Sequence, residues 1–192
     1  MADIYIDDAF GTIHRKHASI HRVAKLLPNN GMGFLMGKEI NTIEKAMQNP
    51  DRPFIAILGG AKVADKIGVV ENLMEKADCV LIGGAMSFTF LKAEGVNVGT
   101  SIVDEKSLEL AKGILDKAKA EGKQIILPVD VAVSTNYSPN SKARFCKIES
   151  IPENYMGLDI GPRTIKLFKQ KIKEAKTIIW NGPMGVFEFP EF

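Results

Sequence analysis

A regular alternation of short apolar runs with longer amphipathic stretches begins at Arg52, and it constrains the fold more than any other feature of this sequence. The apolar runs have the length of buried strands and lie at Phe54–Leu58, Cys79–Ile82, Gln124–Leu127 and Thr177–Trp180. Helical spacing is found between them, over 62–76, 86–94, 104–121 and 163–176. Strands that alternate with helices of this length form βαβ units. We therefore predict an α/β fold class with a doubly wound, mostly parallel, Rossmann-like sheet.

The first of these strands ends in a glycine pair, Gly59-Gly60, directly before the predicted helix over 62–76. Backbone N–H groups point outward at the start of a helix and carry a partial positive charge, so such a junction suits an anion. Lys62 and Lys66 are four residues apart, which places them on one face of that helix. The pattern favours a phosphate site. The alternative is an ordinary strand–glycine–helix turn with solvated lysines, because the full P-loop pattern is lacking.

The other predicted strands end in unusual sequences too. These are Ile82-Gly83-Gly84-Ala85-Met86, Leu127-Pro128-Val129-Asp130 and Trp180-Asn181-Gly182-Pro183-Met184-Gly185. Ligands of open α/β sheets bind beyond the carboxyl ends of the strands, and glycines let a ligand approach the backbone. We predict a nucleotide groove at this edge, with the phosphates at Lys62 and Lys66 and the base and ribose over 83–85 and 181–186. The alternative is that the glycines serve only to form tight turns.

Phosphoryl transfer is the chemistry that such an edge favours. This reaction needs positioning and charge neutralisation more than a nucleophilic side chain, and the sequence has no convincing Ser-His-Asp or Cys-His set. Asp130 and Glu188 are candidate partners for Mg²⁺ or for a ribose. An Asp at the end of a strand is also a common helix cap, which is the alternative for Asp130.

The first fifty residues follow a different pattern. Residues 4–6 suit a short strand, 28–33 are rich in turn residues, and 34–47 have helical spacing that ends at Asn49-Pro50. Farther along the chain, 131–157 is irregular, and we expect a peripheral strand only over Arg144–Ile148.

Three histidines, His14, His17 and His21, would share one face if residues 13–27 formed a helix, and that face could then hold a metal. No carboxylate or cysteine completes such a set, so we favour a basic patch that faces an anion. Arg15, within this patch, can bind a phosphate or carboxylate through two N–H groups.

The composition is that of an ordinary globular chain, with 192 residues, 45% hydrophobic and 25% charged, and a net charge of +2. No basic stripe or set of stacking aromatic residues indicates a nucleic-acid partner. No apolar run reaches the ~18 residues of a membrane span, and Asp3, Asp7 and Asp8 lie where a signal peptide would be basic. Cys79 and Cys146 lack metal or redox spacing, which favours free thiols and a cytoplasmic location.

Six segments closely resemble signature sequences of the phosphoglycerate kinase family. In the family's order, they are Asp8–Ser19, Gly33–Met36, Leu58–Lys66, Leu127–Asp130, Gly157–Pro162 and Trp180–Glu188. The resemblance implies a glycolytic phosphotransferase that moves a phosphoryl group between 1,3-bisphosphoglycerate and ADP, giving 3-phosphoglycerate and ATP. It also implies Mg²⁺ with ADP or ATP, and phosphoglycerate as the second ligand.

The resemblance assigns roles to particular residues. Lys62 and Arg15 would be catalytic, with Lys62 stabilising the transferring phosphoryl group and Arg15 gripping phosphoglycerate together with His14. Lys66 would hold nucleotide phosphates. The other nucleotide-binding positions would be Gly60, Ala61, Gly84, Ala85, Tyr137, Leu158, Asn181, Pro183, Gly185, Val186 and Glu188.

Within that set, the resemblance implies that Leu158 and Tyr137 flank the adenine and that Glu188 reaches the ribose. Two positions depart from the family pattern. Gly37 stands where a lysine is usual, and Ala85 stands where a third glycine is usual.

Members of this family are considerably longer than 192 residues. The resemblance therefore implies that 1–30 are the end of an N-terminal substrate domain, 31–49 an interdomain helix and 50–192 a nucleotide-binding domain incomplete at its C-terminal side. The Gly-Gly-Gly-Asp loop that binds Mg²⁺ in the family has no counterpart here, so we expect no metal ligand. We expect this piece to be inactive alone and to associate through an exposed sheet edge, whereas the completed protein would be a monomer.

Two alternatives remain beside the kinase. One is a module that binds a nucleotide without catalysis. The more remote one is an NAD-dependent dehydrogenase, which would need a Gly-x-Gly-x-x-Gly turn that Leu58-Gly-Gly-Ala-Lys62 does not provide.

Overall fold

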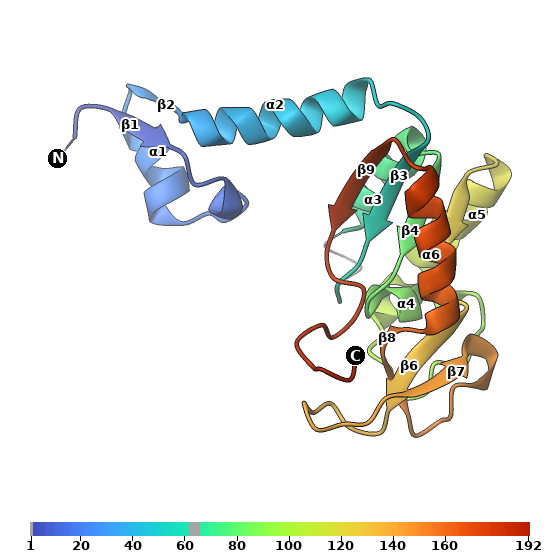
Figure 1. The fold of residues 1–192 in the computed structure, drawn as a ribbon. Coiled ribbons are helices and arrows are strands. Elements are labelled where there is room, and N and C mark those ends of the chain that lie inside the picture. Colours follow the sequence, from blue (N-terminus) through green and yellow to red (C-terminus); the bar gives the residue numbers. More distant parts are fainter. Residues whose placement is uncertain (1, 62–65) are drawn as a thin grey trace. The chain divides into compact units, whose positions relative to one another are not determined.

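The computed structural model describes residues 2–61 and 66–192 of the chain (Figure 1). It divides into two compact units, Met1–Pro50 and Asp51–Phe192, which we describe separately.

The smaller unit is built around a short parallel strand pair, β1 with β2. Its elements are β1 (Tyr5–Asp7), η1 (Phe10–Thr12), the π-helical turn η2 (Ala18–Arg22), α1 (Val23–Leu26), β2 (Asn30–Met32) and α2 (Phe34–Gln48). The predicted strand over 4–6 and the predicted helix over 34–47 correspond to β1 and α2. Only a turn was expected over residues 28–33, but residues 30–32 form a strand that pairs with β1. Three residues with a central glycine give no alternating pattern that could have predicted this strand.

A side chain that lies well before α2 in the sequence caps the start of this helix. Asp8 Oδ1 accepts a hydrogen bond of 2.7 Å from the backbone N–H of Met36, in the first turn of the helix. A carboxylate here satisfies a backbone donor that has no partner within the helix and also interacts favourably with the helix dipole. The first signature segment, which begins at Asp8, therefore fixes the start of α2.

The three histidines do not share a helix face. His14 lies in the turn after η1, His17 is the residue that precedes η2, and only His21 lies within η2. Across residues 2–61 and 66–192, no group of three or more His, Cys, Asp or Glu side chains could hold a metal ion.

The larger unit has the predicted doubly wound parallel sheet. Its strands are β3 (Phe54–Leu58), β4 (Cys79–Ile82), β5 (Gln124–Ile126) and β9 (Thr177–Asn181), in the order β5-β4-β3-β9 with every pair parallel. All residues of β3 and β4 are buried, which explains why the central strands are continuous apolar runs.

Helices cover both faces of this sheet (Figure 1). They are α3 (Ile67–Lys76), α4 (Met86–Ala93), α5 (Leu108–Ala120), which follows η3 (Glu105–Ser107), and α6 (Pro162–Glu174). Phe168 of α6 packs with Ile55, Ile57 and Leu81, which point to one face of the sheet. The alternate β3 residues point to the opposite face, where α3 lies.

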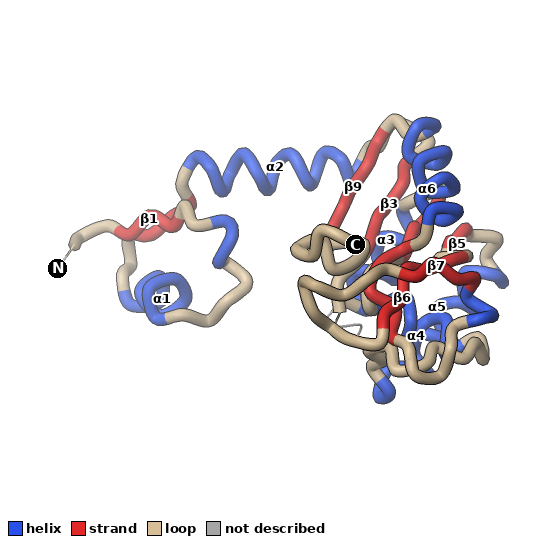
Figure 2. The backbone as a smooth tube through the Cα atoms, turned by 60° about the horizontal axis from the view of Figure 1, so that its bottom comes forward, coloured by secondary structure: helices blue, strands red, loops and turns tan. Residues whose placement is uncertain are grey.

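A second, antiparallel sheet was not predicted. It has the order β7-β6-β8, from β6 (Asp130–Ser134), β7 (Arg144–Lys147) and β8 (Met156–Ile160), with η4 (Ile148–Ser150) after β7 (Figure 2). The peripheral strand expected over 144–148 is β7. Strands β6 and β8 were missed, although β6 is entirely buried. A bulge between Ala132 and Val133 and a glycine within β8, Gly157, interrupt the two-residue period by which strands are recognised.

Among the described residues, β9 pairs on one side only, with β3. Ile178 and Trp180 on this strand are 43% and 62% exposed. The described helices include none that is long and apolar enough to cross a membrane.

Candidate functional site

The carboxyl ends of β3, β4 and β9 are joined through their backbones. Gly59 N–H donates to Asn181 O at 2.9 Å, and Gly60 N–H donates to Pro183 O at 2.9 Å. Gly84 N–H donates to the carbonyl oxygen of residue 184 at 2.7 Å. The three glycine turns therefore form one continuous backbone surface at the edge where α/β sheets bind ligands.

The close approach of these turns explains most of the glycines. A Cβ atom on Gly59 would lie 2.0 Å from Pro183 O, and one on Gly84 would lie 2.5 Å from Gly60 N. A Cβ on Gly182 would lie 2.3 Å from Gly59 O. Contacts between neighbouring turns thus require these glycines, whether or not a ligand also approaches them. A Cβ on Gly60 would meet only the Lys66 side chain, but the φ of this residue is 94°, a left-handed conformation that favours glycine.

A cavity of about 200 Å³ lies against this surface. The residues that line it are Gly60, Ala61, Gly84, Ala85, Ile102, Tyr137, Gly157, Leu158, Pro183, Gly185, Val186 and Glu188. Most of the residues expected to bind a nucleotide are therefore brought together from segments that are far apart in the sequence. Ile102 and Gly157 were missed. Ile102 lies in a loop without periodicity, whereas Gly157 stood in a signature segment and could have been included.

The lining of the cavity indicates the kind of group it can hold. Among the described lining residues, Glu188 is the one with a charge, and the others present apolar side chains or glycine backbone, with the phenol of Tyr137. Ligand pockets usually measure ~300–1,000 Å³, so a cavity of this size suits one part of a larger ligand. A flat heterocycle between apolar walls, with a hydroxyl group near Glu188, matches the lining.

Lys66 lies beside the glycine surface. Its ammonium donates a hydrogen bond of 2.7 Å to Gly59 O, and its partial burial lowers the pKa of the amine. A Cβ on Gly182 would lie 2.7 Å from Lys66 Nζ, so the ammonium sits between the turns after β3 and β9. Lys62 lies outside the described residues. Asn181 ends β9, is exposed and is not among the residues that line the cavity.

Asp130 is a structural cap. Its carboxylate accepts hydrogen bonds from the backbone N–H groups of Arg163 and Thr164 at 2.9 and 2.7 Å, and from the Thr164 hydroxyl. The side chain is buried at the start of α6. Of the two interpretations from the sequence, the helix cap is the one that the contacts support.

The basic patch of the smaller unit forms a second hollow, of about 510 Å³. The ionisable side chains that line it are Asp7, His14, Arg15, Lys16, His21 and Lys25. Arg15 Nε donates to His14 Nε2 at 3.2 Å, which orients the guanidinium. Five basic groups around one carboxylate favour an anionic ligand.

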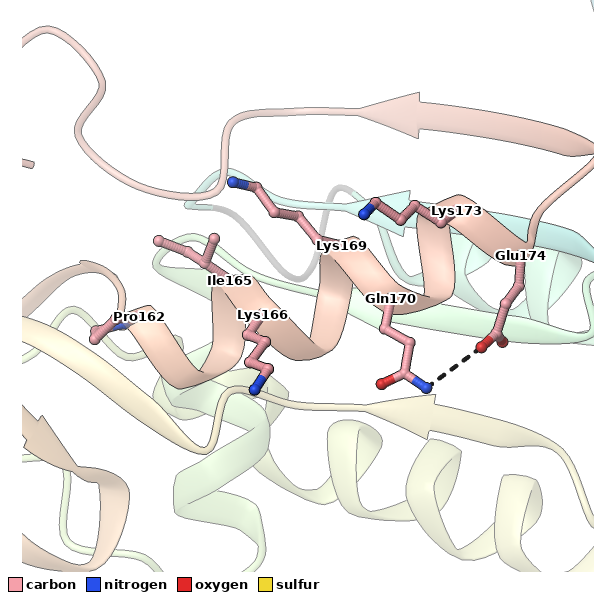
Figure 3. A pocket seen from close by; sticks show the side chains of 7 residues that line it. All are labelled: Pro162, Ile165, Lys166, Lys169, Gln170, Lys173 and Glu174. Carbon is pink, nitrogen blue, oxygen red and sulfur yellow. Dashed lines mark hydrogen bonds between the residues drawn. The ribbon is translucent and has the colours of Figure 1, made fainter.

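A third hollow, of about 600 Å³, lies along the exposed face of α6 (Figure 3). All of its lining comes from that one helix, with Lys169 and Lys173 on one side and Lys166 and Gln170 on the other. Gln170 Nε2 donates a hydrogen bond to Glu174 Oε1 at 3.4 Å. This hollow lies between solvated side chains of one amphipathic helix, apart from the strand ends, and it is not a candidate site.

The larger unit is thus a doubly wound α/β domain with a cavity at the carboxyl edge of its parallel sheet. A family model of phosphoglycerate kinase matches residues 1–192. The chain belongs to the phosphoglycerate kinase family.

Several relatives and solved structures resemble the chain. It is 53% identical over 192 residues to the phosphoglycerate kinase of Finegoldia magna, covering all of this chain and 48% of that protein. It is 50% identical over 192 residues to phosphoglycerate kinase 3, cytosolic, of Arabidopsis thaliana, again covering all of this chain and 48% of the relative. The structure of phosphoglycerate kinase from Coxiella burnetii has a TM-score of 0.85 at 37% identity and covers 99% of this chain and 49% of that one.

The chain thus spans about half the length of the curated relatives it matches. The family match runs over both units, including the signature segments in each, and it gives the dehydrogenase alternative no support.

Proposed function

We propose that the strand-end cavity binds the adenosine part of ADP or ATP, as part of a phosphoglycerate kinase. One observation carries this proposal. Residues from five separate segments, all expected to contact a nucleotide, line a single cavity at the carboxyl edge of the sheet. In this arrangement Tyr137 and Leu158 flank the base, and the Glu188 carboxylate accepts hydrogen bonds from the ribose hydroxyls.

The phosphates of the nucleotide would then extend over the glycine turns toward Lys66. Its ammonium lies beside Gly60, which borders the cavity, and already donates to a backbone carbonyl. A phosphate oxygen that replaces Gly59 O would form a charge-assisted hydrogen bond. We further propose that Lys62 stabilises the transferring phosphoryl group, and that Asn181 contacts the adenosine from the end of β9.

For the smaller unit, we propose phosphoglycerate as the anion held by Arg15 and His14. The support is the basic hollow and the guanidinium that His14 orients within it. A planar guanidinium can pair with a phosphate or carboxylate through two N–H groups. Arg15 would therefore act as the catalytic residue that positions the acyl phosphate.

The reaction proposed for the whole enzyme is phosphoryl transfer from 1,3-bisphosphoglycerate to ADP in glycolysis. The residues described here contribute binding, orientation and positive charge, which are the main requirements of this chemistry. We propose that Mg²⁺ arrives with the nucleotide, because this ion is usually bound through substrate phosphates and water with few protein ligands. We propose a cytoplasmic location and a monomeric complete enzyme that binds neither nucleic acid nor membrane.

Isothermal titration calorimetry with ADP tests the nucleotide site. The 192-residue chain should bind ADP, and Glu188→Ala should weaken binding of ADP while leaving binding of tripolyphosphate unchanged, since the carboxylate contacts only the ribose. Lys92→Met, an exposed lysine paired with Glu105, is a matched surface control. Equal affinities of the wild-type chain and Glu188→Ala for ADP would refute the proposed orientation.

The second candidate function is nucleotide binding without catalysis by these 192 residues. The comparison with the curated relatives favours this candidate, because about half the length of each relative has no counterpart in these 192 residues. A coupled assay should then show no turnover with 3-phosphoglycerate and ATP, although ADP binds. Turnover that Arg15→Ala abolishes would instead show that these residues are sufficient for the reaction.

A further inference from the structure

We propose that Phe189 is a positioning residue that sets the width of the strand-end cavity and so gives it a preference for purine over pyrimidine bases. This inference rests on the proposed nucleotide site. Phe189 does not line the cavity and had no role in the sequence pattern, but it connects two of the cavity's walls.

One of these walls is Tyr137, in the loop between β6 and β7. The rings of Tyr137 and Phe189 lie with their centroids 4.9 Å apart at an interplanar angle of 56°. Tyr137 is 60% exposed, whereas Phe189 is 9% exposed. The buried ring is therefore the fixed partner, and it supports a Tyr137 ring that would otherwise be free to turn into solvent.

The other wall is formed by Leu158 and Val186. Val186 N–H donates to Leu158 O at 2.9 Å, which attaches the C-terminal loop to β8. Phe189 N–H in turn donates to Val186 O at 3.1 Å, closing a tight turn. Since Leu158 and Val186 both line the cavity, the position of Phe189 is fixed relative to that wall.

Both views place the β6–β7 loop and the C-terminal loop side by side, and one ion pair joins them while a hydrogen bond orders the β6–β7 loop (Figures 1 and 2). Lys142 pairs with Glu191 at 3.4 Å, although both side chains are exposed and the pair contributes little. The buried Ser141 hydroxyl donates to Asn136 O at 2.7 Å, which fixes the loop next to Tyr137. The ring pair with Phe189 thus links Tyr137 to the loop whose backbone is attached to the opposite wall.

A fixed separation of the walls has a consequence for selectivity. Two rigid apolar walls reward the larger flat surface of a purine, because both of its faces are covered. If the Tyr137 wall can move, contact with the base is lost, while the phosphate contacts at the glycine turns and Lys66 remain. The effect of Phe189 should appear in base preference and not in phosphate affinity.

The test measures the binding of ADP, UDP and tripolyphosphate by calorimetry to the wild-type chain and three variants. Phe189→Ala should reduce the ratio of ADP to UDP affinity by about fivefold, the size expected for loss of an aromatic pair, without changing tripolyphosphate affinity. Phe189→Trp should keep most of the preference. Phe187→Ala removes a neighbouring ring that is 70% exposed and should leave all three affinities unchanged.

The outcomes separate this inference from the proposed function. A wild-type chain that binds tripolyphosphate but not ADP would refute the nucleotide site itself. A wild-type chain that prefers ADP to UDP, with a Phe189→Ala variant that keeps this preference, would refute the role of Phe189 alone. Equal losses for all three ligands would show that Phe189 acts only through folding. If Phe189→Ala does not fold, Phe189→Leu, which preserves the apolar volume, replaces it under the same criteria.

Discussion

The Thr164 hydroxyl and the Asp130 carboxylate lie 2.7 Å apart in the interior, where the start of α6 meets the first residue of β6. The same hydroxyl also receives hydrogen bonds from the backbone N–H groups of Val129 and Asp130 at 3.0 and 3.1 Å. Two side chains that are 34 residues apart therefore satisfy the polar backbone groups at a helix start and at a strand start. This pair joins the antiparallel sheet to a helix of the parallel one.

Asp130→Ala should destabilise the fold by about 2 kcal/mol. It removes the acceptor of two backbone donors at the start of α6 and of the Thr164 hydroxyl, and loss of a helix-capping side chain costs up to ~2 kcal/mol. Urea unfolding of the two proteins measures the change. Asp116→Asn, an exposed position on α5, should shift the midpoint little.

A second variant at this position, Asp130→Asn, separates the two interpretations of the Asp130 carboxylate as helix cap and as ligand contact. Asp130→Asn keeps one acceptor oxygen and should lose less stability than Asp130→Ala, with no change in ADP affinity. A loss of ADP affinity without a loss of stability would mean that the carboxylate serves a ligand after all.

The parallel sheet could be predicted because buried central strands leave a strong local signal. Both β3 and β4 are unbroken apolar runs followed by glycines, so length and flanking residues were sufficient to find them. The antiparallel sheet could not be predicted, because its central strand β6 follows Pro128 within a few residues and its partner β8 contains Gly157. There, pairing between segments decides the structure more than any local pattern does.

The site was only partly predictable for a related reason. The glycine turns were visible in the sequence, but the reason for most of them, backbone contact between neighbouring turns, depends on three strands that are distant in sequence. Tyr137 could be placed only by resemblance. Ile102 and Phe189 gave no signal, since an apolar residue in a loop is not unusual by itself.

Gly59→Ala should be strongly destabilising, by about 3 kcal/mol, because overpacking costs ~1–3 kcal/mol and this contact is unusually rigid. The new Cβ would lie 2.0 Å from Pro183 O, which is backbone and cannot rotate away. Gly113→Ala is the matched control in a helix, where a Cβ would meet nothing within 4 Å. That variant should instead gain about 0.5–1 kcal/mol from helix propensity. Thermal unfolding of both variants tests the contrast, and similar effects at the two positions would contradict it.

Trp180, the single tryptophan of the chain, should report ligand binding by fluorescence. Its indole N–H donates to Gly182 O at 2.7 Å, and the ring is 62% exposed. A ligand over the 182–185 turn would move this carbonyl and change the surroundings of the indole. ADP should therefore change the emission in a saturable way, with a dissociation constant equal to the calorimetric one. Trp180→Phe should remove the signal and leave the calorimetric affinity in place.

Lys66→Met should weaken ADP binding about tenfold at neutral pH, since one charge-assisted hydrogen bond is worth roughly 1.5 kcal/mol. Lys119→Met, at an exposed position on α5, should change the affinity little. Equal affinities of Lys66→Met and the wild-type chain would exclude contact between this ammonium and the phosphates.

The pH dependence provides a second test of Lys66. Burial lowers the pKa of this amine below the ordinary value of 10.5, so the folded chain releases the proton at a lower pH than the unfolded chain does. Between the lowered pKa and 10.5 the unfolded chain binds more protons, and the contribution of Lys66 to stability therefore rises with pH. ADP binding has the opposite dependence, because only the charged amine attracts phosphate. Calorimetry and urea unfolding from pH 7 to about 10 should show ADP affinity falling and the stability of the wild-type chain rising relative to Lys66→Met. A difference in stability that does not change over this range would mean that the amine is solvated and not held between the glycine turns.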